Sequence, residues 1–326
     1  MEHKKIKEAY LKKLEKIRKG KFVRFNSIKD FKKRYKTKMK HRSFDLLGNI
    51  AIVNFPKNIK QIEKKKFAQK ILEENKSIKI VLEKSGKFSG RLRKMKTKFV
   101  AGEKTKEVLY RENGCVFRFN IDSTYFSPRL SNERKEIASK IKKDDVVLVM
   151  FAGVGPYSIV IAKNSKCEKV YSNEINREAN KYAKLNIELN GLKNKIELLP
   201  GDIKRVAKKL CDGDLRFSSE AIKKIAQPCR EGRLSEGNRR CPRFDVIVMP
   251  RPQLKESFLK EAFDLSKKGT KIFYYDFCKI GEEKNIVDKI KQEAKRNKKN
   301  VKILRIKKAG EIAPFKIRLR VDFVVV

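Results

Sequence analysis

A glycine-rich turn in the second half of the chain has the chemistry to bind a nucleoside cofactor. The apolar run 146–151 leads directly into Gly153 and Gly155, and a predicted helix begins at Pro156. Glycines let the backbone approach a ligand closely, and the helix N-terminus supplies free N–H groups. The turn therefore predicts contact between Phe151, Gly153 or Gly155 and a cofactor.

Two acidic residues follow at the ends of the next two predicted strands. Glu174 closes residues 169–174, where a carboxylate can accept both hydroxyls of a ribose. Asp202 follows residues 195–200 and can take an adenine amino group. With their neighbours Ile175 and Ile203, these residues complete the predicted nucleoside site.

The spacing of the glycines separates two kinds of cofactor. The turn reads GVGP rather than GxGxxG, so the pyrophosphate-binding helix start of a dinucleotide fold is incomplete. This favours S-adenosylmethionine over NAD. The alternative is that these are three ordinary glycine-containing turns of an α/β protein with no cofactor. The occurrence of all three in this order along the chain argues against that alternative.

Strands and helices alternate around these turns. The strands are predicted at 146–151, 169–174, 195–200, 244–250, 270–277, 301–306 and 315–326, and helices begin near Pro156, Arg177, Leu254 and Glu282. Such alternation predicts an α/β fold, a doubly wound Rossmann-like sheet with ligands beyond the carboxyl ends of its strands. The last two strands have no helix between them and should form an antiparallel hairpin at one edge.

Three other segments accompany this domain, which we place at 119–326. Residues 211–243 are polar, with glycine and arginine, and predict a surface insertion. Residues 43–118 predict a smaller α+β domain, with a strand and turn at 44–55, a helix at 61–75 and a strand at 77–84. Residues 1–42 carry 18 Lys and Arg against four acids and predict an RNA-binding segment, although a solvated helix would look similar.

The overall charge favours a polyanionic partner. The chain has 84 Lys and Arg against 39 Asp and Glu, a net charge of +45. Its six cysteines form no CxxC pair, so we expect no metal site. No apolar run is long enough to span a membrane. We therefore expect a cytoplasmic, monomeric protein that binds RNA.

A series of short motifs resembles one known family. These are FDLLG at 44–48, GRLR at 90–93, AGE at 101–103, RENGC at 111–115, YFSPRL at 125–130, Glu133-Arg134, FAGVGP at 151–156 and Ala313-Pro314. In this order they resemble the archaeal and eukaryotic tRNA (guanine-N1)-methyltransferases that act at position 37, over residues 43–326. The resemblance implies a class I methyltransferase fold, with tRNA as its partner.

The resemblance also implies roles for individual residues. Guanine carries a proton on N1, so methyl transfer there benefits from a general base and from a cation near O6. Glu133 matches the base of the family and Arg93 the arginine that contacts the guanine. Tyr125 and Arg134 match residues that line the target or donor pocket. Arg91, Arg93 and Arg129 are expected to contact RNA.

Two positions depart from the family pattern, and the first is Val149, where family members usually have an acid. Relatives commonly end the fourth strand in Asn-Leu-Pro, whereas this chain has Pro250 where the asparagine would be. Proline offers a carbonyl but neither a side-chain amide nor an N–H. Pro250 is kept as a donor-site and catalytic candidate through its carbonyl. The change leaves open whether guanosine or a tricyclic guanine derivative of wyosine synthesis is methylated.

Two other functions remain as alternatives. An aminocarboxypropyl transferase of wyosine synthesis would share the fold and cofactor, and the mass added to tRNA would distinguish it. A non-catalytic RNA-binding protein with a methyltransferase fold would fail to bind S-adenosylmethionine in calorimetry.

Overall fold

A computed structural model describes residues 44–56, 58–86, 90, 92, 95–212, 226–228, 240–250 and 256–326. The predicted RNA-binding segment 1–42, both Arg91 and Arg93, and most of the predicted insertion lie outside these residues. None of the described helices is long and apolar enough to cross a membrane.

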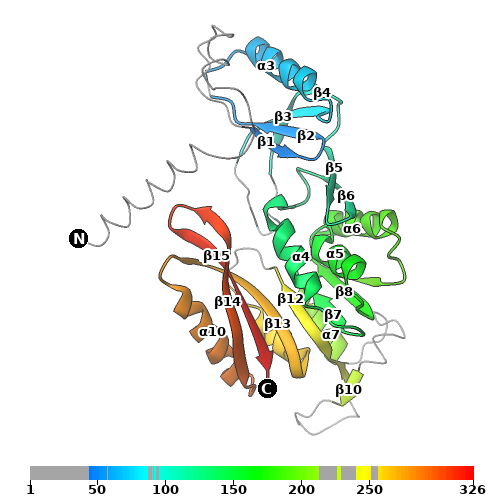
Figure 1. Ribbon diagram of the computed structural model, residues 1–326, viewed down its shortest axis with the longest axis vertical. Coiled ribbons are helices and arrows are strands. Elements are labelled where there is room, and N and C mark those ends of the chain that lie inside the picture. Colours follow the sequence, from blue (N-terminus) through cyan, green and yellow to red (C-terminus); the bar gives the residue numbers. More distant parts are fainter. Residues whose placement is uncertain are drawn as a thin grey trace, which may run out of the picture. The chain divides into compact units, whose positions relative to one another are not determined.

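The larger domain is built on a seven-stranded sheet with the order β14-β15-β13-β12-β7-β8-β9 (Figure 1). Its strands are β7 (Val146–Val149), β8 (Lys169–Glu174), β9 (Ile196–Pro200), β12 (Phe244–Met249), β13 (Ser266–Lys279), β14 (Val301–Ala313) and β15 (Lys316–Val325). Neighbours from β13 to β9 are parallel, and β15 is antiparallel to both β13 and β14. The predicted doubly wound sheet with an antiparallel edge hairpin is confirmed.

Helices cover both faces of this sheet because its central strands are apolar on both sides. Val147 and Val149 pack in one core with α4 (Ser131–Ser139), α5 (Pro156–Asn164) and α6 (Arg177–Leu189). Val146 and Leu148 face the other core, and its helices are α7 (Ile203–Cys211), α9 (Leu259–Asp264) and α10 (Glu283–Arg296). A fully buried parallel strand needs this continuous apolar run.

Strand β15 instead alternates between apolar and charged residues. Ile317, Leu319, Val321 and Phe323 pack in the core with α9 and α10. Between them, Arg318, Arg320 and Asp322 point to the opposite face, since successive side chains of a strand alternate. All three are buried. This charged face of β15 brings ionisable groups to the site described below.

The smaller domain contains a four-stranded sheet with the order β1-β2-β3-β4. Its elements are β1 (Phe44–Leu47), β2 (Ile50–Val53), α3 (Gln61–Glu74), β3 (Ile80–Lys84) and β4 (Thr97–Gly102). The α3 helix buries Ala68 and Ile71 against the sheet. The helix predicted at 61–75 is α3, and the strand predicted at 77–84 is β3. The segment 44–55, predicted as a strand with a glycine turn, forms a hairpin of the two strands β1 and β2.

A second hairpin, β5 (Glu107–Glu112) with β6 (Cys115–Asn120), is held by helix α6. Asn186 accepts from the backbone N–H of Arg118 at 2.7 Å and donates to its carbonyl at 3.0 Å. Asn190 makes the same pair of bonds with Val116, at 3.0 and 2.7 Å. The predicted boundary between 118 and 119 falls inside β6.

Two predicted segments differ in detail from the structure. The helix expected near Leu254 begins at Leu259, and residues 251–255 lie outside the described part. Helix α7 occupies 203–211, up to the start of the predicted insertion. Within that insertion, β10 (Ala226–Pro228) and β11 (Arg240–Pro242) pair antiparallel.

Candidate active site

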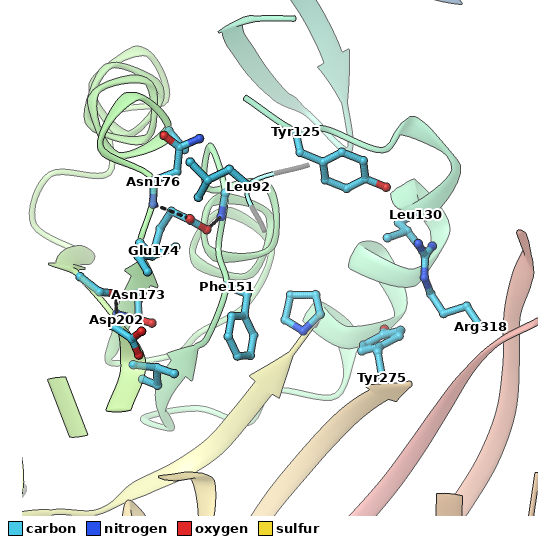
Figure 2. A pocket seen from close by; sticks show the side chains of 16 residues that line it. Leu92, Tyr125, Leu130, Phe151, Asn173, Glu174, Asn176, Asp202, Tyr275 and Arg318 are labelled. Carbon is cyan, nitrogen blue, oxygen red and sulfur yellow. Dashed lines mark hydrogen bonds between the residues drawn. The ribbon is translucent and has the colours of Figure 1, made fainter. Parts of the chain in front are cut away.

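A pocket opens at the carboxyl ends of β7, β8, β9 and β12 (Figure 2). The residues that line it are Leu92, Tyr125, Leu130, Phe151, Gly153, Asn173, Glu174, Ile175, Asn176, Ala179, Gly201, Asp202, Ile203, Pro250, Tyr275 and Arg318. This is the edge at which doubly wound sheets bind ligands. Seven predicted donor-site residues are among them: Phe151, Gly153, Glu174, Ile175, Asp202, Ile203 and Pro250.

The glycine turn is shaped by its neighbours. Gly155 has φ +87° and precedes the first turn of α5, and a Cβ there would lie 3.2 Å from the Ile159 side chain. Only glycine adopts this conformation without cost. Gly155 thus holds the turn without lining the pocket, whereas Gly153 lines it directly.

Glu174 links this turn to the start of α6. Its Oε2 accepts from the Gly153 N–H at 2.8 Å, and its Oε1 accepts from the Asn176 N–H at 2.7 Å. A carboxylate oxygen can accept more than one hydrogen bond, so both oxygens can also accept from ribose hydroxyls. The side chain is therefore oriented by backbone groups before any ligand binds.

Asp202 lies at the neighbouring strand end and caps helix α7. Its carboxylate accepts from the Lys204 N–H at 3.0 Å. Asn173, which sequence analysis did not select, is buried and donates to the carbonyls of Leu199 and Gly201 at 2.7 and 3.1 Å. These bonds join β8 to the end of β9 and keep the two acids on one side of the pocket (Figure 2).

The other side of the pocket is aromatic and cationic. Figure 2 shows Tyr125, Tyr275 and Arg318 across the pocket from Glu174 and Asp202. Tyr275 is on β13 and Arg318 on β15, so both come from strands beyond the nucleoside half of the sheet. The sequence alone did not single out Tyr275 and Arg318. Neither residue follows a glycine turn, and neither is the last residue of a strand that leads into a helix.

Glu133 lies behind this wall. Its Oε2 accepts from the Tyr275 hydroxyl at 3.0 Å and from Arg320 at 2.6 Å, and its Oε1 pairs with Lys307 at 2.5 Å. Burial holds the pKa of Tyr275 well above its usual value, so its hydroxyl stays a donor at neutral pH. The base candidate is therefore 6% exposed and linked to the pocket through Tyr275.

Glu136, one turn further along α4, shares the cations of Glu133. It pairs with Arg320 at 2.6 Å and with Lys307. Burial alone would raise the pKa of Glu136, but hydrogen bonds from Arg320 and Lys307 outweigh it and lower the pKa to about 2. A carboxyl with a depressed pKa stabilises the fold above its unfolded value of 4.5.

We expect this contribution to disappear as the pH falls from about 4.5 towards 2. The difference in unfolding free energy between the parent and Glu136→Gln should be largest at neutral pH and shrink in that window, measured by urea denaturation. Glu188→Gln, which removes an exposed partner of Lys193, should change stability by about 0–1 kcal/mol at most. A difference that is independent of pH would contradict the assignment.

Arg134 does not lie where the resemblance suggests. It is 1% exposed, pairs bidentately with Glu112 of β5, and donates to the Ser127 carbonyl at 3.0 Å. Its guanidinium also lies 5.1 Å from the Phe126 ring centre. Because these partners enclose its guanidinium, Arg134 supports the 125–130 segment, and it is not among the residues that line the pocket.

The remaining predicted residues divide into two groups. Arg129 lies in the 3-10 turn η1 (Pro128–Leu130), is exposed and does not line the pocket. Arg91 and Arg93 fall outside the described residues. Their expected contacts with RNA and guanine stay predictions.

A doubly wound sheet with a glycine turn and two acidic strand ends of this kind defines a class I S-adenosylmethionine-dependent methyltransferase. The chain belongs to the TRM5/TYW2 methyltransferase family. The TRM5/TYW2 methyltransferase domain matches residues 108–225, and the TYW2 N-terminal domain matches residues 29–105.

Individual relatives extend this similarity over most of the chain. The tRNA (guanine(37)-N(1))/4-demethylwyosine(37)-methyltransferase Taw22 of Nanoarchaeum equitans is 32% identical over 86% of this chain and 98% of its own length. The crystal structure of Trm5b from Pyrococcus abyssi is 29% identical, with a TM-score of 0.67 over 92% of this chain and 78% of that one. Methanocaldococcus jannaschii Trm5 in complex with adenosine is 26% identical, with a TM-score of 0.64 over 87% and 74%.

The pocket fits S-adenosylmethionine. Two carboxylates at adjacent strand ends suit the ribose and adenine, and Gly153, with φ +60°, holds a backbone conformation that favours glycine where the turn lines the pocket. We expect Glu174→Ala to weaken binding of S-adenosylhomocysteine by roughly 10- to 150-fold, since a hydrogen bond to a charged group contributes about 1.5–3 kcal/mol.

Calorimetric titration measures this loss. Glu178→Ala is the matched control, because Glu178 lies four residues further on, its side chain is 45% exposed, and within the described residues its carboxylate pairs with Lys181. Equal affinity of the parent and Glu174→Ala would rule out the ribose assignment.

Proposed function

We propose that this protein transfers a methyl group from S-adenosylmethionine to N1 of guanosine 37 in tRNA. The observation that carries the proposal is the two-sided pocket. Its acidic side suits the donor nucleoside, and its opposite side offers Tyr125, Tyr275 and Arg318 for a base. This chain is similar to the Nanoarchaeum relative over 98% of that relative's length, and the name of the relative supports the choice of guanine 37.

The chain's own residues divide the work of the reaction. S-adenosylmethionine supplies an activated methyl group bound to sulfur. Glu174 and Asp202 hold the donor nucleoside, and Tyr125 and Tyr275 form walls for a base turned out of the anticodon loop. As the methyl group leaves sulfur and bonds to N1, the N1 proton passes to the Tyr275 hydroxyl, whose own proton passes to Glu133, and S-adenosylhomocysteine is left. Arg93 neutralises the charge that develops on O6, as the resemblance to the family implies.

A second substrate has specific support. The Nanoarchaeum relative is named as a methyltransferase of 4-demethylwyosine at the same position of tRNA. A tricyclic base needs a wider slot than guanine, and Pro250 lines the pocket at the position where relatives carry an asparagine. Methylation of this derivative is therefore the alternative to test beside guanosine.

Mass spectrometry of nucleosides tests both substrates. Two tRNAs, one with guanosine 37 and one with 4-demethylwyosine 37, are incubated with the protein and S-adenosylmethionine. We expect 1-methylguanosine from the first. Addition of an aminocarboxypropyl group instead would identify the transferase of wyosine synthesis, and no added mass on either tRNA would favour a non-catalytic RNA-binding protein.

The basic segment 1–42 has a separate test. Each phosphate contact adds about 0.7–0.9 to the slope of log affinity against log salt. Deleting residues 1–40 should reduce that slope for tRNA and leave S-adenosylhomocysteine binding unchanged. An unchanged slope would show that the segment makes no phosphate contacts.

A further inference from the structure

Arg318 is a buried cation that opens into the pocket without a matching anion. Its residue is 9% exposed, and its guanidinium lies 5.3 Å from the Phe277 ring centre, directly across the β13–β15 ladder. As far as the structure describes the chain, no carboxylate or hydrogen-bond acceptor pairs with it. Burial of a charge is costly unless it is compensated. We therefore expect a bound ligand to supply the hydrogen-bond acceptors that compensate the buried charge of Arg318.

Its neighbour Arg320 shows what a structural arginine on this strand looks like. Arg320 lies two residues further on the same face and is fully buried. It pairs with Glu133, Glu136 and Asp322, at 2.6, 2.6 and 2.7 Å. Three carboxylates surround Arg320 and none pairs with Arg318 among the described residues. The difference separates a core ion network from a binding group.

The position of Arg318 in the sheet indicates which ligand it meets. β15 is separated from β8 by β13, β12 and β7, which at about 4.8 Å per strand places it roughly 19 Å from the strand that holds Glu174. Of the strands that contribute lining residues, β15 is therefore the one furthest in the sheet from β8 and from a ribose bound at Glu174. Figure 2 shows Arg318 beside Tyr125 and Tyr275, at the end of the pocket away from the two acids.

We propose that Arg318 is a specificity-determining residue that donates a forked pair of hydrogen bonds to O6 and N7 of the target guanine. This inference rests on the proposed function. The planar guanidinium matches the two acceptors on that edge of guanine, whereas adenine presents an amino donor in place of O6. Tyr125 and Tyr275 bound the base laterally, and Arg318 reads its edge.

A substitution on each side of the contact tests the proposal. Single-turnover methylation is measured with tRNAs that carry guanosine or 7-deazaguanosine at position 37, the latter lacking N7. For the parent, loss of N7 removes one bond from a charged donor and should lower the rate constant at subsaturating tRNA by about 10- to 150-fold. Arg318→Met removes both bonds, so it should lose at least this factor with guanosine and little more with 7-deazaguanosine, because the same bond cannot be lost twice.

Two further variants control for charge and folding. Arg318→Lys keeps the charge without the fork and should fall between the parent and Arg318→Met. Lys302→Met removes an exposed cation from β14 and should keep the parent's preference for guanosine over 7-deazaguanosine. Thermal unfolding of each variant shows whether a lower rate comes from unfolding of the protein. The ratio of the rates with guanosine and with 7-deazaguanosine can still be measured when only part of the protein is folded.

Two results would overturn the proposal. One is an equal penalty for 7-deazaguanosine in the parent and in Arg318→Met. The other is weaker binding of S-adenosylhomocysteine but unchanged binding of methylthioadenosine by Arg318→Met, which would assign Arg318 to the donor carboxylate. Failure of the proposed function looks different, because the parent itself would then leave N1 of guanosine 37 unmethylated.

Discussion

Glu133→Gln is expected to lower the single-turnover rate of tRNA methylation by about 10²–10⁴-fold, the usual cost of losing a general base. Glutamine keeps the shape of the side chain and can still accept from Tyr275, but it cannot take the N1 proton. The loss should fall on the rate at saturating tRNA and leave tRNA affinity nearly unchanged, because proton removal belongs to the transition state.

Glu136→Gln is the matched control for this experiment. Glu136 is on the same helix and pairs with the same Lys307 and Arg320, but the described contacts link only Glu133 to Tyr275. Both substitutions weaken one ion network, and only Glu133→Gln removes a carboxylate joined to the pocket. Equal losses of rate in the two variants would show that the network acts through stability and that another group takes the proton.

Glu112→Gln is expected to lower the free energy of unfolding by about 3–5 kcal/mol, the cost of removing one partner from a buried ion pair. The side chains of Arg134 and Glu112 are 1% and 3% exposed, so water cannot replace the lost carboxylate. The arginine would lose its only paired negative charge and keep the amide oxygen of the glutamine, the Ser127 carbonyl and two aromatic rings. Urea denaturation at neutral pH measures the change.

Glu107→Gln provides the comparison from the same hairpin. Glu107 pairs with Arg118, and both side chains are substantially exposed, so the pair should contribute about 0–1 kcal/mol. Similar losses for the two variants would mean that burial does not strengthen the Glu112–Arg134 pair. Affinity for S-adenosylhomocysteine should persist in Glu112→Gln wherever it is folded, because Arg134 does not line the pocket.

The donor half of the site was predictable from local patterns. The continuous apolar run of β7 indicates a strand buried on both faces, and the glycines after it indicate a turn that approaches a ligand. Glu174 and Asp202 follow their strands directly, and parallel strands in a doubly wound sheet bring their carboxyl ends to one edge. Each of these features depends on neighbours within a few residues, so the order of the chain suffices to locate them.

The target half depended on long-range pairing. Tyr275 and Arg318 reach one wall only because β15 inserts between β13 and β14, which aligns Phe277 with Arg318. Glu133 and Arg320 form an ion pair across 187 residues of sequence. No local period signals such a contact, because it is set by the order of strands in the sheet.

Glu133 and Arg134 illustrate the same limit at the scale of one helical turn. They are adjacent in the sequence, and a shared role in the pocket is a natural reading of the pair. Successive residues of a helix point about 100° apart, however, so the two side chains leave α4 in different directions. Glu133 faces β13 and β15, while Arg134 turns to Glu112 on β5, and their different surroundings follow from which elements pack against each side of α4.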